Sequence, residues 1–227
     1  MHAIITKLVA EVLEEMEIVD KTIAVIGIGC GSLTKRILDT DVVCTNHGRA
    51  PAVATGVTRC APDKAVFTYQ GDGDLAAIGL SEILCAANRG ENFVTVFVNN
   101  GTYGMTGGQM APTSLIGQKT TTTPLGRNPL SEGYPMRMCE IISQLDAPRF
   151  VARYAVDSPS AILKAKKGLR KAFEIQQRGE GFTFVEFLSN CPTNWGMSPL
   201  KTLDYIHEKT MKVFPLGVFR DISGGEE

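Results

Sequence analysis

Residues 65–100 read AVFTYQGDGDLAAIGLSEILCAANRGENFVTVFVNN, and this stretch decides the fold of the 227-residue chain. Ala65–Gln70 and Phe93–Val98 are near-continuous apolar runs, a pattern typical of parallel strands that are covered on both faces. The stretch between them, near residues 75–89, has the pattern of a helix. A strand–helix–strand crossover of this length makes the two strands parallel and brings their carboxyl ends together. The stretch therefore predicts one unit of an α/β fold.

The same alternation continues through the rest of the chain. Further strands are predicted at Thr22–Ile28, Asp41–Thr45, Phe150–Ala155 and Phe182–Leu188, and further helices near residues 3–16, 32–39, 50–60, 136–146, 158–178 and 199–212. No repeat or linker interrupts the pattern, which predicts a doubly wound α/β fold with a mostly parallel sheet, in a single domain over residues 1–227. Residues 99–135 break the rhythm, because they are rich in Gly, Thr, Pro and Met and follow the carboxyl end of a strand. Ligands of α/β sheets bind at such ends, so we predict a long ligand and interface loop there.

The composition excludes several classes of protein. A net charge of −1, with 44% hydrophobic and 21% charged residues, is typical of a globular protein and gives no sign of a nucleic-acid or membrane-surface partner. No run approaches the roughly 18 apolar residues of a membrane-spanning helix, and the acidic start MHAIITKLVAEVLEEME is unlike a signal peptide. The six cysteines are scattered without a C-x-x-C pair, which indicates reduced thiols rather than a disulfide framework. A cytoplasmic location is expected.

A glycine cluster, GIGCGS at residues 27–32, follows the first predicted strand. It is similar to the G-x-G-x-x-G dinucleotide fingerprint, but Ser32 occupies the third glycine position. About 20 residues on, where an acid would meet the ribose, stands His47. Dinucleotide binding is therefore disfavoured. The cluster is either a tight turn that needs positive φ or a turn whose backbone approaches a ligand.

A second polar cluster is more specific. Gly71, Asp72, Gly73 and Asp74 follow one predicted strand, and Asn100 follows the next one, 28 positions after Asp72. A carboxylate and an amide oxygen that meet at one sheet edge suit Mg²⁺, which completes its shell with phosphate oxygens and water. The helix that follows directs its N-terminal N–H groups to the same place, which favours an anion. The sequence therefore predicts a site for Mg²⁺ and a phosphate group.

These residues carry a resemblance to thiamine diphosphate enzymes, in the domain that holds the diphosphate. The run QGDGDLAAIGLSEILCAANRGENFVTVFVNNGTYGMTGGQMAPT resembles the β subunit of 2-oxoacid:ferredoxin oxidoreductases, most closely the 2-oxoisovalerate (branched-chain) type. Further matches are HGRAPAVATG (47–56), GQKTTTTPLGR (117–127), GYPMRMCE (133–140), CPTNWG (191–196) and FPLGVF (214–219). The resemblance covers nearly the whole chain.

The resemblance implies a role for each matching residue. Asp72, Asn100 and the backbone carbonyl of Thr102 would be the Mg²⁺ ligands. The diphosphate would be lined by Gly71, Gly73, Asp74, Gly104, Met105, Thr106 and Gly107. The thiazolium end of the cofactor would lie near Cys30, Gly31, Ser32 and His47. His47 is the candidate catalytic residue, and the alternative is a hydrogen-bonded structural histidine.

The resemblance also implies an activity and partners. The activity is the oxidative decarboxylation of a 2-oxoacid to acyl-CoA, with coenzyme A as acyl acceptor and electrons passed through iron–sulfur clusters to ferredoxin. Thiamine enzymes also need a pyrimidine-binding domain whose glutamate activates the cofactor, and a single domain leaves no room for it. Glu82, inside a predicted helix, is poorly placed for that role. We therefore expect a partner α subunit to supply the glutamate, together with further γ- or δ-type subunits.

Related β subunits hold a [4Fe–4S] cluster on four cysteines, beginning with a C-P-G-C-G-H run. Cys30 and Cys191 stand where the last two of these ligands would be, but the first pair is absent, and Met1-His2 falls about where the run would end. The favoured explanation is a truncated or misassigned start. The alternatives are a member without the cluster or one that completes it differently, and each cysteine could also be an ordinary buried thiol.

Two other functions stay open at this point. One is a subunit of a non-oxidative 2-oxoacid decarboxylase or an acetolactate-synthase-like enzyme, which the absent C-x-x-C favours. The other is a catalytically silent structural or regulatory subunit, which the presence of both Asp72 and Asn100 disfavours. The helix over residues 161–178 is a docking face for an acidic ferredoxin or, more typically, a solvated face. Its basic residues are Lys164, Lys166, Lys167, Arg170, Lys171 and Arg178.

Overall fold

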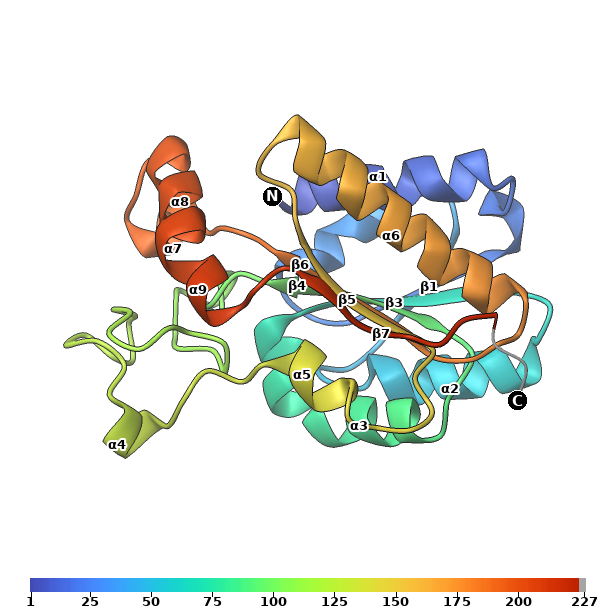
Figure 1. The fold of residues 1–227 in the computed structure, drawn as a ribbon, viewed down its shortest axis with the longest axis horizontal. Coiled ribbons are helices and arrows are strands. Elements are labelled where there is room, and N and C mark those ends of the chain that lie inside the picture. Colours follow the sequence, from blue (N-terminus) through green and yellow to red (C-terminus); the bar gives the residue numbers. More distant parts are fainter. Residues whose placement is uncertain (225–227) are drawn as a thin grey trace.

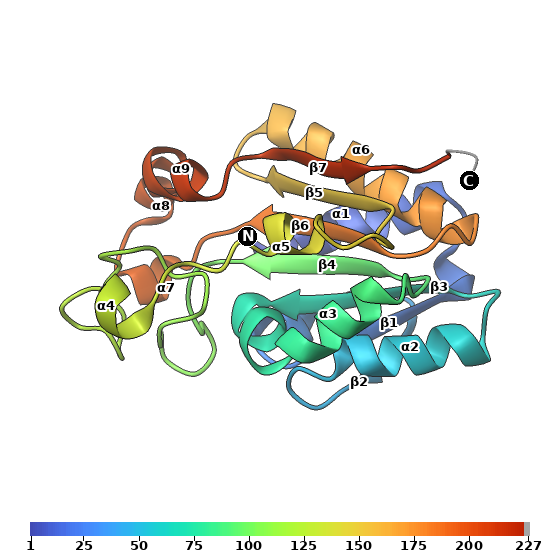
Figure 2. The same cartoon turned by 60° about the horizontal axis from the view of Figure 1, so that its bottom comes forward.

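The computed structural model describes residues 1–224, and these form one seven-stranded sheet (Figure 2). The strands are β1 (Thr22–Ile26), β2 (Asp41–Cys44), β3 (Ala65–Gly71), β4 (Val94–Asn99), β5 (Phe150–Ala155), β6 (Thr183–Leu188) and β7 (Gly217–Asp221). Their order is β2-β1-β3-β4-β6-β5-β7, and all neighbours are parallel except β7, which is antiparallel to β5. The prediction of a mostly parallel sheet is confirmed.

Helices cover both faces of this sheet (Figure 1). The α-helices are α1 (His2–Glu15), α2 (Ala50–Cys60), α3 (Leu80–Asn88), α4 (Pro129–Glu132), α5 (Met138–Ile142), α6 (Pro159–Gln177), α7 (Pro192–Trp195), α8 (Pro199–Tyr205) and α9 (Met211–Val213). Helices α1 and α6 lie on one face, and α2, α3 and α5 lie on the other, so the doubly wound α/β prediction is also confirmed. None of the helices within residues 1–224 is long and apolar enough to cross a membrane.

Two apolar cores hold these layers together. On the α1 and α6 face, Phe67 of β3 meets Phe173 of α6 edge to face, with ring centroids 5.8 Å apart. On the opposite face, the rings of Phe93 and Phe182 meet in the same way at 5.3 Å. Each of these fully buried side chains stabilises the fold by roughly 1.5–3 kcal/mol relative to an exposed one. The central strands are therefore fixed from both sides.

The structure differs from the predictions at several elements. Where a helix was expected near 32–39, residues 30–36 form a 3-10 helix, η2 (Cys30–Arg36), which packs against β3 and α1. The helix expected near 136–146 is only α5, and the helix expected near 75–89 begins as a π-helical turn, η3 (Gly73–Ile78), before α3. Strand β7 was not predicted, because it is a short, half-exposed edge strand without a continuous apolar run.

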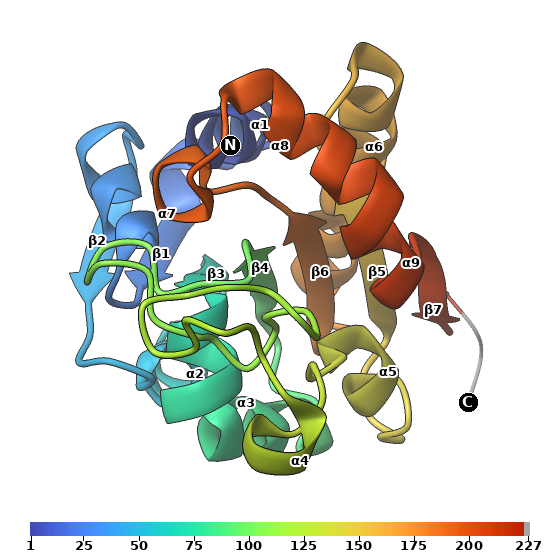
Figure 3. The ribbon, with the colours of Figure 1, turned by 90° about the vertical axis from the view of Figure 1, so that its left-hand side faces the viewer.

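The carboxyl ends of the parallel strands form the functional edge of the fold. Strands β3 and β4 are direct neighbours there, as the crossover of residues 65–100 predicted. Figure 3 looks at this edge and shows residues 99–135, in green to yellow-green, crossing in front of the sheet, with α7 and α8 beside them. The N-terminal end of α1 lies at the same edge, where His2 Nδ1 contacts the Tyr69 hydroxyl at 3.1 Å.

Candidate functional site

A cavity opens at this edge, at the ends of β1, β3 and β4. The residues predicted for the site line it, except Ser32 and Gly107: they are Cys30, Gly31, His47, Gly71, Asp72, Gly73, Asp74, Asn100, Thr102, Gly104, Met105 and Thr106. Ile28 and Gly29 of the first glycine cluster line it as well, together with His2 and Tyr103, which the sequence did not predict. The fold therefore brings segments that are far apart in the chain to one place.

Asp72 follows β3 and is only 2% exposed. Its Oδ1 accepts a hydrogen bond from the Gly73 N–H at 2.9 Å, and its Oδ2 accepts from the Gly101 N–H at 2.7 Å and the Thr113 hydroxyl at 2.6 Å. Burial raises the pKa of this carboxyl to about 6, although the hydrogen bonds act in the opposite direction. The ion pairs described within residues 1–224 do not include Asp72. A bound cation would supply the positive partner that this buried carboxylate lacks among those ion pairs.

The turn after β4 presents a second set of oxygens. The side chain of Asn100 is buried, and its Oδ1 accepts a hydrogen bond from the Thr102 N–H at 3.1 Å. Gly101, between them, has a φ of +65°, which favours glycine, and its N–H reaches Asp72. Asp72 and Asn100 therefore leave adjacent strands at the same edge and are joined through one peptide unit. This is the arrangement that the spacing of the two residues predicted.

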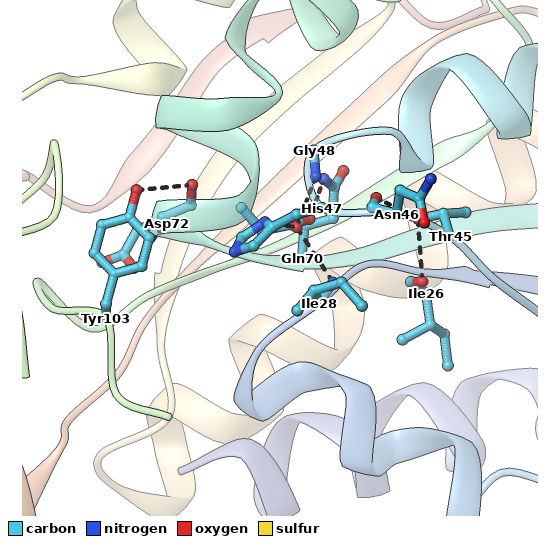
Figure 4. Close-up of polar contacts among 11 residues, drawn as sticks. Ile26, Ile28, Thr45, Asn46, His47, Gly48, Gln70, Asp72 and Tyr103 are labelled. Carbon is cyan, nitrogen blue, oxygen red and sulfur yellow. Dashed lines mark hydrogen bonds and ion pairs between the residues drawn. The ribbon is translucent and has the colours of Figure 1, made fainter. Parts of the chain in front are cut away.

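Asp74 has a different environment from Asp72, because protein groups occupy both of its oxygens. Figure 4 labels the residues that supply these groups, Ile28, Gly48 and Gln70. The Asp74 Oδ1 accepts from the Ile28 N–H at 3.2 Å and the Gly48 N–H at 2.9 Å, and its Oδ2 accepts from the Gln70 side-chain amide at 2.6 Å. The carboxylate thus joins the turn after β1, the segment after β2 and the end of β3. A carboxylate also repels a diphosphate, so we interpret Asp74 as the residue that holds the cavity walls in place.

His47 contacts the same carboxylate from the other side. Its Nδ1 lies 2.5 Å from Asp74 Oδ1, but the angles at this contact are not those of a hydrogen bond. The contact is an ion pair when the imidazole is protonated. The ring also packs edge to face near Tyr103, with centroids 6.5 Å apart. His47 is therefore oriented by its neighbours and lines the cavity, as both the catalytic and the structural interpretation require.

Tyr103 is the main residue that the sequence did not point to. Its hydroxyl donates a hydrogen bond to the Gly73 carbonyl at 3.2 Å, and burial raises the pKa of the phenol, with Asp72 and Asp74 adding to the shift. A Cβ placed on Gly73 would lie 2.2 Å from the Tyr103 ring. The second glycine of the GDG motif is therefore required by this aromatic contact. The tyrosine itself gave no local signal, since its position depends on the turn at Gly101.

The first glycine cluster forms a tight turn at the border of the cavity. Gly29 has a φ of +112° and lines the cavity, so the turn is tight and its backbone borders the site. Gly27 is required for another reason, because a Cβ there would lie 2.1 Å from Asp74 Oδ2. This turn is thus fitted directly against the carboxylate that holds it.

The long loop over residues 99–135 is anchored by one buried arginine. Arg127 is 4% exposed and donates hydrogen bonds to five backbone carbonyls. They belong to Gly133, Pro112, Ser114, Glu132 and Tyr134, at 2.6–3.0 Å. These bonds fix a segment that has little regular structure of its own.

Replacing Arg127 by Lys is expected to destabilise the protein by about 2 kcal/mol, because a lysine can satisfy only part of this set of carbonyls. Urea unfolding measures the loss, and limited proteolysis within residues 112–134 should become faster. The matched control is Arg137→Lys, at an exposed arginine of the same region. Equal behaviour of the two variants would contradict the anchoring role.

Cys30 and Cys191 lie together at the rim of this cavity. A Cβ placed on Gly104 would lie 3.2 Å from Cys30 Sγ and 3.5 Å from Cys191 Sγ, so the two sulfurs flank the same glycine. Burial raises the pKa of the Cys30 thiol, and Cys191 adds to the effect. All six cysteines are free, and within residues 1–224 no group of three or more His, Cys, Asp or Glu side chains could hold a metal ion. The predicted pair is adjacent, but the described residues bring no third such ligand to it.

Two charged features lie away from the cavity. Glu82, in the first turn of α3, is ion-paired with Arg49 and does not line the cavity. The basic face of α6 is largely paired within the chain. Its pairs are Lys166 with Glu11 and Glu15, Arg170 with Glu15 and Glu174, Lys171 with Asp221, and Arg178 with Glu180. This pairing favours a solvated helix face over a ferredoxin-docking face.

Comparison with known proteins first defines the class. Residues 27–187 match the family described as "Thiamine pyrophosphate enzyme, C-terminal TPP binding domain". The match begins directly after β1 and includes β2 to β5, nearly all of β6 and the cavity residues from Ile28 to Thr106.

The relatives narrow this class. The chain is 45% identical over 226 residues to the ketoisovalerate oxidoreductase subunit VorA of Methanothermobacter thermautotrophicus, covering 100% of this chain and 47% of that protein. It is 38% identical over 197 residues to the 2-oxoglutarate synthase subunit KorB of Methanocaldococcus jannaschii, covering 86% of this chain and 68% of that protein. The chain belongs to the 2-oxoacid oxidoreductase subunits of the thiamine pyrophosphate enzymes. It spans about half the length of the ketoisovalerate relatives that it matches.

A solved structure agrees with this assignment. The fold matches a chain of the 2-oxoglutarate:ferredoxin oxidoreductase from Magnetococcus marinus, solved with 2-oxoglutarate, coenzyme A and succinyl-CoA bound, with a TM-score of 0.83 and 29% identity. The match covers 99% of this chain and 80% of that chain. The family resemblance seen in the sequence and the fold predicted from it are both confirmed.

Proposed function

We propose that this chain binds thiamine diphosphate and Mg²⁺ in its cavity, as one domain of a 2-oxoacid:ferredoxin oxidoreductase that forms acyl-CoA. The observation that carries the proposal is the meeting of Asp72, Asn100 and Thr102 at the ends of β3 and β4, in a chain of this family. The named relatives favour the oxidoreductase over a non-oxidative decarboxylase. The higher identity to the ketoisovalerate subunit than to the 2-oxoglutarate subunit supports a branched-chain 2-oxoacid as substrate.

The donor set fits Mg²⁺ with a diphosphate. Asp72 offers a buried carboxylate, Asn100 an amide oxygen and Thr102 a backbone carbonyl, and these hard oxygen ligands leave room for phosphate oxygens and water. Among the hydrogen bonds described for residues 1–224, none ends on the Thr102 carbonyl oxygen. Burial raises the pKa of Asp72 to about 6 because it disfavours the charged carboxylate. A divalent cation bound there would favour the charged form and so lower this pKa again.

The other cavity residues act by position and exclusion. Gly73 lets the Tyr103 ring close one wall, while Gly104, Met105 and Thr106 bring the backbone of the long loop to the diphosphate side. His47 lies against Asp74 and is our candidate for a group that holds or moves a proton. When bound, thiamine diphosphate supplies an acidic carbon that adds to the 2-oxoacid ketone and a ring that takes up the electrons left by CO₂.

The glutamate that activates the cofactor has to come from outside the cavity lining described above. Glu82 is held by Arg49 on the surface of α3, so we assign this role to a pyrimidine-binding partner subunit. Further γ- or δ-type subunits, ferredoxin and coenzyme A complete the proposed assembly. The six free cysteines agree with a reducing, cytoplasmic location.

Cys30 and Cys191 are proposed as two thiolate ligands of an iron–sulfur cluster. Their sulfurs flank Gly104 at the rim of the cavity, which is a suitable place for a cluster that takes electrons from the bound cofactor. Within residues 1–224 no third cysteine joins this pair, so the remaining cluster ligands would have to come from elsewhere in the assembly. If the two thiols hold no cluster, they are ordinary half-buried cysteines.

The test uses the native assembly, purified through a tag on this chain. Thiamine diphosphate should bind in a calorimetric titration only when Mg²⁺ is present, and the assembly should contain iron and acid-labile sulfide. Ferredoxin reduction should depend on both coenzyme A and a 2-oxoacid, with 2-oxoisovalerate used better than pyruvate or 2-oxoglutarate. Release of CO₂ without reduction of ferredoxin would favour the decarboxylase, and binding without Mg²⁺ would refute the metal site.

A further inference from the structure

Three buried polar side chains form a row across the middle of the sheet. Asn99, Glu186 and Arg153 lie on the neighbouring strands β4, β6 and β5, and each is at most 1% exposed. Glu186 is directly opposite Arg153 in the strand register, and Asn99 lies at the end of β4. The rest of these strands is mainly apolar, so the row is an exception that requires a physical reason.

Hydrogen bonds join the members of the row. The Asn99 amide donates to Glu186 Oε1 at 2.8 Å, and the Arg153 Nε donates to Glu186 Oε2 at 2.8 Å. The other guanidinium nitrogens of Arg153 reach both carboxylate oxygens of Glu140 on α5, at 3.1 and 2.6 Å, and the Pro215 carbonyl at 3.1 Å. The guanidinium also lies over the rings of Phe214 and Phe219.

Such a row is not needed to hold the strands together. Buried ion pairs contribute little net stability, because the loss of hydration offsets most of the attraction between the charges. The ladder bonds already join β4, β6 and β5, and the rings of Phe97 and Phe184 pack together between β4 and β6. What the row does add is a fixed orientation for its last member, Asn99, which is adjacent to Asn100.

The turn that follows Asn99 is held from two sides. Asp72, directly after β3, accepts a hydrogen bond from the Gly101 N–H, and the N–H of Ser189, directly after β6, donates to the Asn99 carbonyl at 2.8 Å. Glu186 adds the only side-chain bond that the structure describes for the Asn99 amide within residues 1–224. Through this bond Glu186 reaches the residue at which the chain leaves β4, directly before Asn100.

We propose that Glu186, itself held by Arg153, is a positioning residue that orients the Asn99–Asn100 turn for cation binding. The inference rests on the proposed function, since the cation is the one assigned to Asp72, Asn100 and Thr102. Glu186 does not line the cavity, so it acts through Asn99 and not by touching the ligand. Partners that orient metal ligands in this way typically contribute 10–100-fold to metal affinity.

The test measures the Mg²⁺ concentration that half-saturates thiamine diphosphate binding in the native assembly, by calorimetry. Glu186→Ala should raise it roughly tenfold, at the lower end of the range for such partners. Glu186→Gln should restore it to within about twofold, because a carboxamide can accept from Arg153 and donate to a reversed Asn99 amide. Asn99→Ala leaves the Glu186–Arg153 pair intact and should show the same tenfold loss. It therefore serves as the test variant if Glu186→Ala does not fold.

The matched control is Glu91→Ala. Glu91 is also a buried acid paired with arginines, Arg59 and Arg89, but it lies before the amino-terminal end of β4. Its loss should lower the unfolding temperature without changing the Mg²⁺ requirement. The inference is overturned if Glu186→Ala and Asn99→Ala both bind Mg²⁺ like wild type, if Glu186→Gln binds as weakly as Glu186→Ala, or if Glu91→Ala shows the same loss. A wild-type assembly that binds no thiamine diphosphate would instead refute the proposed function.

Discussion

Replacing Asp72 by Asn is expected to weaken Mg²⁺-dependent binding of thiamine diphosphate at least about a hundredfold. The substitution keeps the size of the side chain but removes the charge of the only carboxylate among the three proposed ligands. Loss of an indirect partner of a metal ligand already costs 10–100-fold, so loss of charge on a direct ligand should cost more. Burial makes the effect larger, because the interaction with the cation is little screened in this environment.

The measurement is a calorimetric titration of thiamine diphosphate at several Mg²⁺ concentrations, on the wild-type and variant assemblies. Glu82→Gln is the matched control, since it removes a carboxylate that follows the same motif but is paired with Arg49 away from the cavity. It should bind the cofactor like wild type. Unchanged binding by Asp72→Asn would refute the metal assignment, and a large loss in Glu82→Gln would place a functional acid on α3.

The sequence predicted the site best where strand ends determine its geometry. Asp72 and Asn100 follow two apolar runs joined by one helix, so the fold class alone brings them together. Tyr103 and His2 could not be found in this way. Tyr103 depends on the turn at Gly101, and His2 reaches the cavity because α1 packs so that the ring contacts Tyr69, which is 67 positions away. Neither contact has a local pattern.

The buried ion pair between Arg153 and Glu186 did have a signal in the sequence, although the apolar residues around it made that signal easy to miss. The runs FVARYA (150–155) and TFVEFL (183–188) each contain one charge, of opposite sign, inside a strand that is otherwise apolar. Opposite charges at matching places in two neighbouring parallel strands predict a buried pair, and the structure contains it as Arg153 and Glu186. The edge strand β7 lacked such a signal, since two of its five residues are exposed and the other three are only partly buried.

Asp74→Ala is expected to destabilise the protein by about 4 kcal/mol and to disorder the wall of the cavity. Asp74 is 2% exposed and accepts from Ile28, Gly48 and Gln70, so its loss leaves two backbone N–H groups and one amide without a partner. Each buried donor left in this way costs roughly 1–3 kcal/mol. Urea unfolding measures the change, and hydrogen exchange at residues 27–31 and 46–49 reports the local opening.

Asp74→Asn is the informative control, because it separates hydrogen bonding from charge. The Asn Oδ1 can keep the bonds from Ile28 and Gly48, and its Nδ2 can donate to a reversed Gln70 amide, whose Oε1 has no partner in the present structure. The variant should therefore regain all but about 1 kcal/mol of the stability. If Asp74→Asn is as unstable as Asp74→Ala, the charge beside His47 is what the fold requires. If both variants are as stable as wild type, the carboxylate does not hold the walls of the cavity.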